Sequence, residues 1–193
     1  MPRRQAANAD AAIVGLPGQD VEDQKRNDDD CRRGDSGQTA AVIVRLYEPP
    51  DRDGVLALVE RLQEGVAPWR DAAAVRAAMD EWVRGAVDSD ATGTRAVFVA
   101  EEDGEIIGFA TASTRRHFAG DIDAYVGELA VARHVERRGV GRRLMLAAEE
   151  WARHQGLACV TLHTGAANAR ARTFYAALGY EEEDVRLTKR LDS

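Results

Sequence analysis

Hydrophobic residues recur along this chain at two spacings, one typical of strands and the other of helices. Runs of apolar and β-branched residues predict strands over residues 41–47, 95–100, 106–113, 124–131, 158–163 and 184–191. Apolar residues three and four apart predict helices over residues 51–64 and 139–155, a helix that begins at Asp71, and one between Asn168 and Gly179. This order mixes hairpins with helical crossovers, which indicates a mixed α/β layer structure and argues against a doubly wound nucleotide-binding fold.

The first 40 residues differ in composition from the rest of the chain. They are rich in Asp, Arg, Gln and Asn, and they include the acidic run Asp28-Asp29-Asp30. They hold too few large apolar groups to offset the entropy lost on ordering. We therefore predict a disordered N-terminal extension over residues 1–40 and one folded domain over residues 41–193. A regulatory or docking segment is the alternative for residues 1–40.

Composition and charge exclude several classes of protein. The 193 residues carry a formal net charge of −7, which argues against a nucleic-acid binder and mildly favours a cationic substrate. The apolar runs are strand-sized, so we expect no transmembrane helix, and the short amino-terminal run is broken by Gly15 and Pro17, which argues against a signal peptide. Cys31 and Cys159 form no CxxC pair, and no His/Cys cluster has metal-ligand spacing. These features predict a reduced, cytoplasmic protein without a metal.

A glycine-containing turn precedes the predicted helix 139–155. Free backbone N–H groups collect at a helix start, where the helix dipole adds positive potential. Gly139 and Gly141 leave room for a ligand to approach the backbone. Four arginines add positive charge: Arg137, Arg138, Arg142 and Arg143. The turn matches neither the Walker loop nor the dinucleotide-binding fingerprint. It predicts a diphosphate-binding site, with an ordinary structural turn as the alternative.

A second motif follows the predicted strand 158–163. It reads Asn168-x-x-Ala171-x-x-Phe174-Tyr175-x-x-x-Gly179-Tyr180. Together with the glycine turn, it resembles the GCN5-related N-acetyltransferase (GNAT) superfamily over about residues 41–191. The resemblance implies the GNAT fold, a central mixed, mostly antiparallel sheet of six to seven strands with about four flanking helices. One position departs from the family pattern, because Glu136 stands where Arg or Gln is usual, and this puts one phosphate contact in doubt.

The resemblance also implies a chemistry and a set of site residues. It implies acetyl-CoA as the acetyl donor and a primary amine as the acceptor. Leu129 and Val131 would hold the donor through backbone groups, Asn168 would bond the pantetheine arm, and Tyr175 would protonate the departing thiolate. The cofactor-binding set implied in full is Leu129, Ala130, Val131, Arg137, Arg138, Gly139, Val140, Gly141, Arg142, Asn168 and Tyr175.

An alkylammonium must lose a proton before it attacks a thioester, which calls for a general base. Glu128 is a carboxylate within an otherwise apolar strand, where burial raises its pKa toward a useful range. His163 is the rival base, and a water chain is the third possibility. The structural alternatives are a core aromatic for Tyr175, a carboxylate paired with Arg115 or Arg116 for Glu128, and an ordinary interior or rim histidine for His163.

Three functions follow in order of preference. The first is acetylation of a small-molecule amine by direct attack in a ternary complex, since no cysteine lies where a covalent acyl intermediate is expected. The second is acetylation of a protein lysine or N-terminus. The third is a CoA-binding sensor without turnover. Trp69 and Trp82 are expected to pack the first two helices, with an aromatic wall of the acceptor pocket as the alternative. A homodimer is left open.

Overall fold

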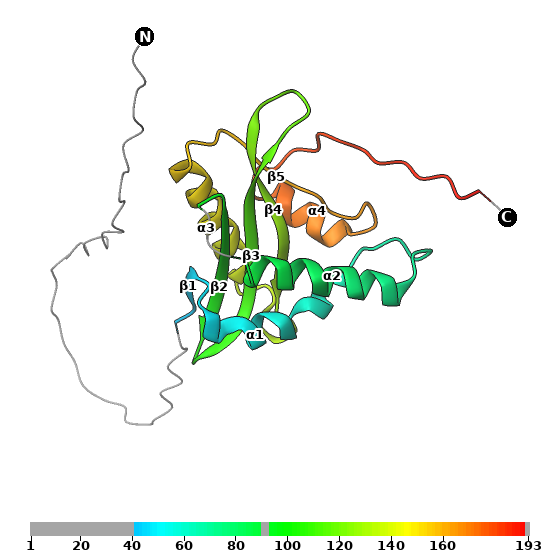
Figure 1. The fold of residues 1–193 in the computed structure, drawn as a ribbon. Helices are drawn as coiled ribbons and strands as arrows, with labels where there is room; N and C mark the ends of the chain where they lie inside the picture. The colour runs from blue at the N-terminus through cyan, green and yellow to red at the C-terminus, as the bar shows by residue number, and fades with distance from the viewer. Residues whose placement is uncertain (1–40, 90–92, 192–193) are drawn as a thin grey trace, which may run out of the picture. The chain divides into compact units, whose positions relative to one another are not determined.

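The structure is a computed structural model that describes residues 41–89 and 93–191; the predicted extension over residues 1–40 lies outside the described residues. Its centre is one sheet with the strand order β1-β2-β3-β4-β5 (Figure 1). The strands are β1 (Ile43–Leu46), β2 (Arg95–Glu102), β3 (Glu105–Arg116), β4 (Ile122–Val131) and β5 (Val160–Leu162). Neighbours from β1 to β4 are antiparallel, and β5 is parallel to β4. The predicted mixed, mostly antiparallel sheet is therefore confirmed.

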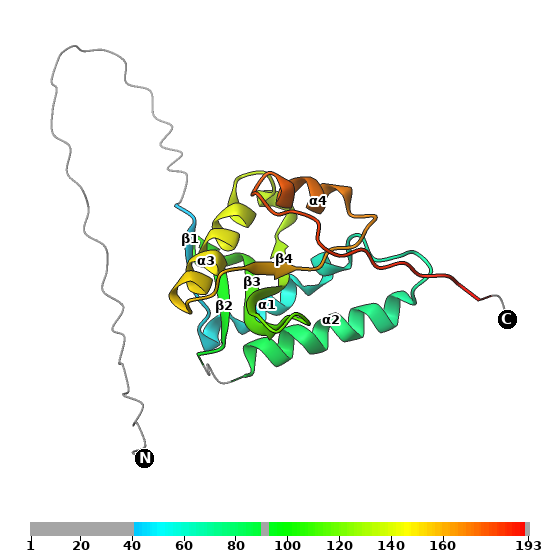
Figure 2. The same ribbon diagram turned by 90° about the horizontal axis from the view of Figure 1, so that it is seen from above.

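Helices lie on both faces of the sheet. The α-helices are α1 (Arg52–Ala57), α2 (Ala72–Val87), α3 (Val140–His154) and α4 (Ala169–Ala176). Short 3₁₀ helices are η1 (Pro49–Asp51), η2 (Val59–Gln63) and η3 (Arg133–Val135). Helices α1 and α2 lie on one face of the sheet and α3 lies on the other (Figure 2). The four flanking α-helices thus match the predicted architecture.

The core forms where the helices press on the central strands. Phe109 of β3, Val83 of α2 and Leu144 of α3 are all fully buried. Helix α3 is amphipathic, with its buried residues three and four apart as the sequence pattern requires. Those residues are Val140, Leu144, Met145, Ala148 and Ala152. Burial of each large side chain contributes about 1.5–3 kcal/mol, so this interface fixes α3, and hence its first turn, against the sheet.

Three predictions about elements are wrong. The helix expected over residues 51–64 changes its winding at Leu58, because α1 gives way to η2, and this brings the adjacent Leu58 and Val59 both into the core. Residues 184–191 form no strand, and Leu187 in this segment is 89% exposed. The alternation of apolar residues there was real, but a strand also needs a paired neighbour. The described sheet therefore has five strands instead of six or seven.

A β-bulge interrupts the pairing of β3 with β4. Ala110 pairs with Leu129 and Ala112 pairs with Val126, so Thr111 lies opposite two residues of β4, Gly127 and Glu128. Such a bulge bends the strand and re-aims its side chains. Strand β5 pairs with β4 only over residues 124–126, which lie before the bulge. Beyond the bulge, β4 has an unpaired edge on the β5 side.

Candidate active site

The backbone groups of Leu129 and Val131 lie at an edge of β4 that pairs with no strand among the described residues, and the Val131 carbonyl accepts a hydrogen bond from Arg61 at 3.1 Å. The amide of Ala132 donates to the carbonyl of Ile107 at 2.8 Å, on the β3 side. In an antiparallel pair, successive residues alternate between bonding the partner and pointing away from it. Leu129 and Val131 therefore point away from β3, toward the gap beside β5. We call these two residues the β4 edge. A ligand with amide groups bonds such an edge as an added strand does.

Ala130 differs from its two neighbours. The same alternation directs its backbone groups to Phe109 of β3, and its side chain is buried. Its amide and carbonyl are thus used within the sheet. Ala130, which the sequence resemblance included among the cofactor-binding residues, does not belong to the open edge.

The turn before α3, residues 136–142, holds a row of free backbone amides; we call it the α3 turn. Arg137 and Gly139 have positive φ angles of 62° and 83°, and Gly139 caps the helix without a side-chain hydrogen bond. The first amide that bonds within the helix is that of Arg143, at 3.1 Å from the Gly139 carbonyl. Five earlier amides find no acceptor among the described residues: those of Arg137, Gly139, Val140, Gly141 and Arg142. Free amides at a helix start form a binding site for an anion such as a diphosphate.

Both the amide and the side chain of Arg138 are bonded to other residues of the chain. Its amide donates to the Val135 carbonyl at 3.3 Å, and its guanidinium makes an ion pair with Glu102 of β2 at 2.5 Å. The predicted contribution of its amide to a phosphate site is therefore not supported by this geometry. The other five amides carry that prediction.

Gly141 lies where three elements meet. A Cβ added at Gly141 would lie 3.4 Å from Phe174 of α4 and 3.7 Å from Val131 at the end of β4. The free amides of the α3 turn are thus adjacent to the β4 edge and to the helix that carries Tyr175. A single ligand that bonds the β4 edge through amides and the α3 turn through phosphates fits this arrangement.

Asn168 fixes the start of α4. Its Oδ1 accepts a hydrogen bond from the amide of Ala171 at 3.0 Å, and its Nδ2 donates to the carbonyl of Glu64 at 3.2 Å. A side-chain amide has a second N–H, and that donor is left for a ligand. The loops also touch directly, because a Cβ added at Gly165 would collide with the backbone of Gly65, and one added at Gly65 would collide with Asn168.

Tyr175 offers a protonated hydroxyl. Its ring packs against Phe174 with centroids 5.2 Å apart and edge-on against Tyr180 at 5.9 Å. Burial raises the pKa of Tyr175 to about 12. Its hydroxyl bonds none of the described residues, so the proton is free for a reacting group. The ring itself packs against other aromatic side chains, as the core-aromatic alternative expects.

Glu128 is a partly buried carboxylate on the α1–α2 face of the sheet. Gly108 of β3 lies against α3, so alternation turns Thr111 to the opposite face. The Thr111 hydroxyl donates to the Glu128 carboxylate and accepts from the Glu128 amide at 3.1 Å. Burial raises the pKa of Glu128, and the Thr111 hydrogen bond opposes this. The Arg115 guanidinium lies over the ring of Tyr125, and no ion pair joins Glu128 to a described residue, so the expected pairing with Arg115 or Arg116 is wrong; the partner of the carboxylate is Thr111.

His163 follows β5 and is exposed, as the rim-histidine alternative expected. Its Nδ1 lies 3.3 Å from the hydroxyl of Tyr125 on β4, and the Arg115 guanidinium lies 4.7 Å from the centroid of the Tyr125 ring. Burial raises the pKa of Tyr125, the Arg115 charge opposes this, and the Glu128 charge adds to it. Tyr125 therefore lies within electrostatic reach of Glu128. Sequence analysis missed this residue, because its position in the strand pattern carries no motif.

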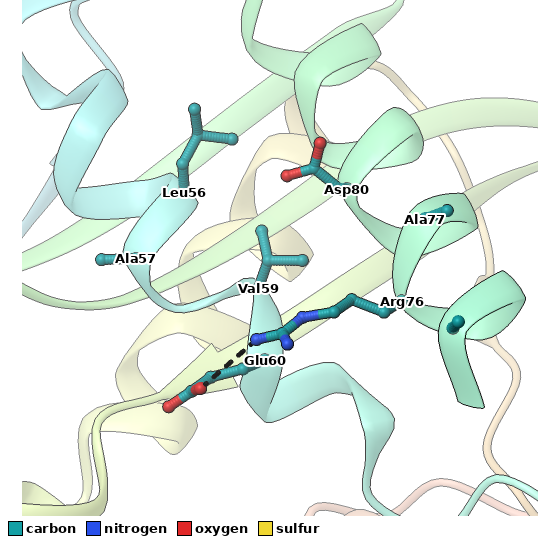
Figure 3. Close-up of a pocket in the computed structure, with 8 residues that line it drawn as sticks. Leu56, Ala57, Val59, Glu60, Arg76, Ala77 and Asp80 are labelled. Atoms are coloured by element: carbon teal, nitrogen blue, oxygen red, sulfur yellow. Dashed lines mark ion pairs between the residues drawn. The ribbon is translucent and has the colours of Figure 1, made fainter.

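An open depression lies between α1, η2 and α2 (Figure 3). It has a volume of about 560 Å³ and is lined in part by Val59, Arg76 and Asp80, and an ion pair of 3.7 Å joins Arg76 to Glu60. None of the predicted site residues lines it. Trp82 of α2 is 59% exposed and Trp69 is 50% exposed, so the prediction that both pack the helices is wrong.

Metal ligation and membrane insertion have no support in the part of the chain that the structure describes. No group of three or more His, Cys, Asp or Glu side chains within residues 41–89 and 93–191 is arranged to hold a metal ion. In the same ranges, no helix has the length and apolar character needed to cross a membrane. Cys159 is exposed and free, and Cys31 lies outside the described residues.

Comparison with known proteins identifies the family. A family model described as "Acetyltransferase (GNAT) family" matches residues 57–180, more than half of the chain. The uncharacterized N-acetyltransferase YhfO of Bacillus subtilis is 36% identical over 88 residues, which cover 45% of this chain and 59% of that protein. The aminoglycoside N(6')-acetyltransferase type 1 of Salmonella typhimurium is 30% identical over 93 residues, which cover 46% and 64%. The chain thus spans less than two thirds of the length of these relatives.

Solved structures share the fold. The aminoglycoside N-acetyltransferase AAC(6')-Iy in complex with CoA superposes with a TM-score of 0.62 at 22% identity, over 80% of this chain and 97% of that chain. Glucosamine-6-phosphate N-acetyltransferase from Arabidopsis thaliana superposes with a TM-score of 0.57 at 16% identity, over 79% and 99%. At these identities the likeness concerns the fold. The family match, which includes both the α3 turn and the motif that begins at Asn168, goes further: the chain belongs to the GNAT family of acetyltransferases.

Proposed function

We propose that this protein is an N-acetyltransferase that moves an acetyl group from acetyl-CoA to a primary amine of a small molecule. The observation that carries the proposal is the adjacency of the β4 edge and the α3 turn at Gly141. CoA has amide groups in its pantetheine arm and a diphosphate beyond them. The free amides of the α3 turn and the backbone groups of the β4 edge, of which only the Val131 carbonyl is already bonded, to Arg61, match these two parts of the molecule. When bound, acetyl-CoA supplies the activated acetyl group.

The α3 turn holds the diphosphate by charge-assisted hydrogen bonds from its five free amides. Each such bond contributes about 1.5–3 kcal/mol, and the helix dipole adds about 0.3–1 kcal/mol. These hydrogen bonds come from backbone amides. They are therefore kept even though the Glu136 side chain, unlike the usual Arg or Gln, has no donor for a phosphate. Its carboxylate is paired with Arg61 and Arg170, at 2.5 and 2.7 Å, which neutralises its charge beside the turn.

Glu128 is the general base in this proposal. Its carboxylate has no ion-pair partner among the described residues, and burial raises its pKa toward the range in which a base is useful. It takes the proton from the acceptor ammonium, which leaves the amine nitrogen free to attack the thioester carbon. Exposed His163 is the weaker candidate, because it is joined to the site through Tyr125.

Tyr175 is the general acid. As the carbon–nitrogen bond forms, the carbon–sulfur bond breaks, and the sulfur receives the phenolic proton. A hydroxyl with a pKa of about 12 stays protonated at neutral pH and gives its proton to the departing thiolate, which leaves as the thiol. After the attack the nitrogen still carries one proton in excess; it loses this proton to solvent, and the Tyr175 phenolate is reprotonated from solvent. Glu128 returns the proton that it took from the ammonium to solvent, so the reaction releases one proton in total.

The acceptor is a cationic small amine in this proposal, and an amino sugar is the first class to test. The support is the unpaired carboxylate of Glu128, which favours the approach of an ammonium group, and the presence of aminoglycoside acetyltransferases among the relatives. Acetylation of a protein lysine or N-terminus is the second candidate function. A homodimer remains a prediction from the sequence.

An acceptor screen tests the proposal. Aminoglycosides, polyamines, amino acids and peptides are incubated with acetyl-CoA, release of free thiol is followed, and the acetylated product is identified by mass. We expect turnover with a small amine at a modest KM. Turnover only with peptides would favour the protein acceptor. Binding of CoA without thiol release across the panel would favour a sensor and contradict the proposed activity.

A further inference from the structure

Arg61 joins elements that are distant in the sequence. It lies in η2, and its side chain is only 10% exposed. Its Nε donates to the carbonyl of Val131 at 3.1 Å, and its Nη2 lies 2.5 Å from Glu136. Its Nη1 donates to Glu64. One guanidinium therefore holds the end of β4, the α3 turn and its own segment together.

Glu136 extends this contact to a fourth element. Its second oxygen lies 2.7 Å from Arg170 in the first turn of α4. The hydrogen bond from Arg170 holds the pKa of Glu136 below its usual value, so the carboxylate is charged at neutral pH. Glu136, which departs from the family pattern, thus binds Arg61 with one carboxylate oxygen and Arg170 with the other. It has a structural role in place of a phosphate contact.

The position of this pair matters for a ligand with two parts. Val131 belongs to the β4 edge, and Glu136 begins the α3 turn. The pair spans the junction between them and bonds the Val131 carbonyl, so it sets the separation between the β4 edge and the free amides of the α3 turn. When two parts of one ligand bind together, the second part binds with a high effective concentration only if the spacing is right. A change in this spacing therefore weakens binding of the whole ligand more than it weakens binding of either part alone.

We propose that Arg61 and Glu136 are positioning residues that hold the β4 edge and the α3 turn at the separation that lets one CoA molecule bind both. The inference rests on the proposed function and deepens it. It differs from a simple role in stability, because it concerns the coupling between two halves of one binding site. A lysine at position 61 keeps the charge but lacks the planar fork that reaches Val131 and Glu136 together.

The test compares a two-part ligand with a one-part ligand. Dissociation constants for CoA and for ADP, which carries only the nucleotide and diphosphate, are measured for the wild type, Arg61→Lys and Glu136→Gln. We expect Arg61→Lys to weaken CoA binding about tenfold and ADP binding less than twofold. Glu136→Gln is expected to act in the same direction. The double variant is expected to lose less CoA affinity than the two single losses combined, because substitutions within one ion-pair network are not additive.

Arg133→Lys is the matched control. This neighbouring arginine is 78% exposed and lies 3.7 Å from Glu64, and we expect it to leave both constants within twofold. Equal loss of CoA and ADP binding in Arg61→Lys, or a lower Tm with an unchanged ratio of the two constants, would overturn the inference. Failure of the wild type to bind CoA would instead overturn the proposed function itself, and the inference with it.

Discussion

Burial acts on two ionisable side chains of the site with opposite consequences for catalysis. It raises the pKa of Tyr175 to about 12, so this hydroxyl keeps its proton across the pH range of an assay. It also raises the pKa of Glu128, which makes the carboxylate a better proton acceptor but delays its ionisation as pH rises. One physical cause thus suits Tyr175 to the proposed role of proton donor and Glu128 to the proposed role of proton acceptor.

Substitution of Tyr175 by Phe removes the donor and keeps the ring. We expect kcat to fall by roughly 100-fold, because a positioned general acid typically contributes about 10²–10⁴-fold. The affinity for acetyl-CoA is expected to change little, since the ring contacts with Phe174 and Tyr180 remain. Steady-state kinetics and calorimetric titration measure the two effects. An unchanged kcat would remove Tyr175 from the chemistry.

The hydrogen bond from Thr111 offers a test of Glu128 as the proposed general base. Its hydroxyl lowers the pKa of Glu128, so Thr111→Val is expected to raise that pKa. A general base must be ionised to act, and a higher pKa therefore moves the acid limb of the kcat/KM profile to higher pH. Thr111→Ser keeps the hydroxyl and serves as the control. A pH profile that is the same in Thr111→Val and the wild type would contradict the role of Glu128.

At the scale of elements, the sequence pattern located most of the fold. Helix α3 was predictable because its apolar residues recur three and four apart, and the hairpin of β2 and β3 because Asp103 and Gly104 form its turn; both have positive φ in the structure. The prediction of a strand over residues 184–191 is wrong because the alternation of apolar residues does not show whether a neighbouring strand is available for pairing. The predicted packing of Trp82 is wrong because helical spacing alone does not show which face of the helix is covered.

The candidate site was predictable where a motif carries it and hidden elsewhere. Sequence motifs indicate the local geometry of Gly139, Gly141 and Asn168. Arg61 and Tyr125 stand in no motif, and their roles arise from contacts with Val131 and His163 that only the folded chain creates. The involvement of Arg138 with Glu102 was likewise not visible, since β2 and the α3 turn are distant in the sequence.

The start of α3 requires a left-handed residue. Gly139 has φ +83° with open space around it, so Gly139→Ala is strained by about 1 kcal/mol without a clash. Gly156 has φ +71° and equally open surroundings at the other end of the helix. We expect both substitutions to lower the Tm by similar amounts. Only Gly139→Ala is expected to weaken CoA binding, and equal binding by the two variants would argue against the α3 turn as the diphosphate site.

For the whole molecule, the candidate site is the place where three elements of the fold meet. The β4 edge exists because β5 pairs with only part of β4, the α3 turn is fixed by the packing of α3 on the sheet, and α4 brings Phe174 against Gly141. The contacts of Arg61 and Glu136 link these pieces, and the packing of α3 anchors the turn in the core. Loss of a core residue such as Leu144 costs about 2–5 kcal/mol and threatens the entire fold.

The described chain also has a segment without regular structure. Residues 181–191 are exposed throughout, and Arg186, Lys189 and Arg190 lie in it. Such segments are preferred sites of proteolysis. In limited digestion with trypsin, we expect these bonds to be cut before any other bond within residues 41–191, as followed by mass spectrometry. Earlier cleavage at Arg61, whose side chain is largely covered, would contradict the described packing.

The contact between Gly65 and Gly165 has a consequence for engineering. The two loops touch through main-chain atoms, so neither can accept a side chain at the junction without moving the other. One loop follows η2, and the other leads into α4. A chimaera that exchanges the first loop for that of another enzyme must therefore take the second loop from the same donor, because the pair forms a single transplantable unit.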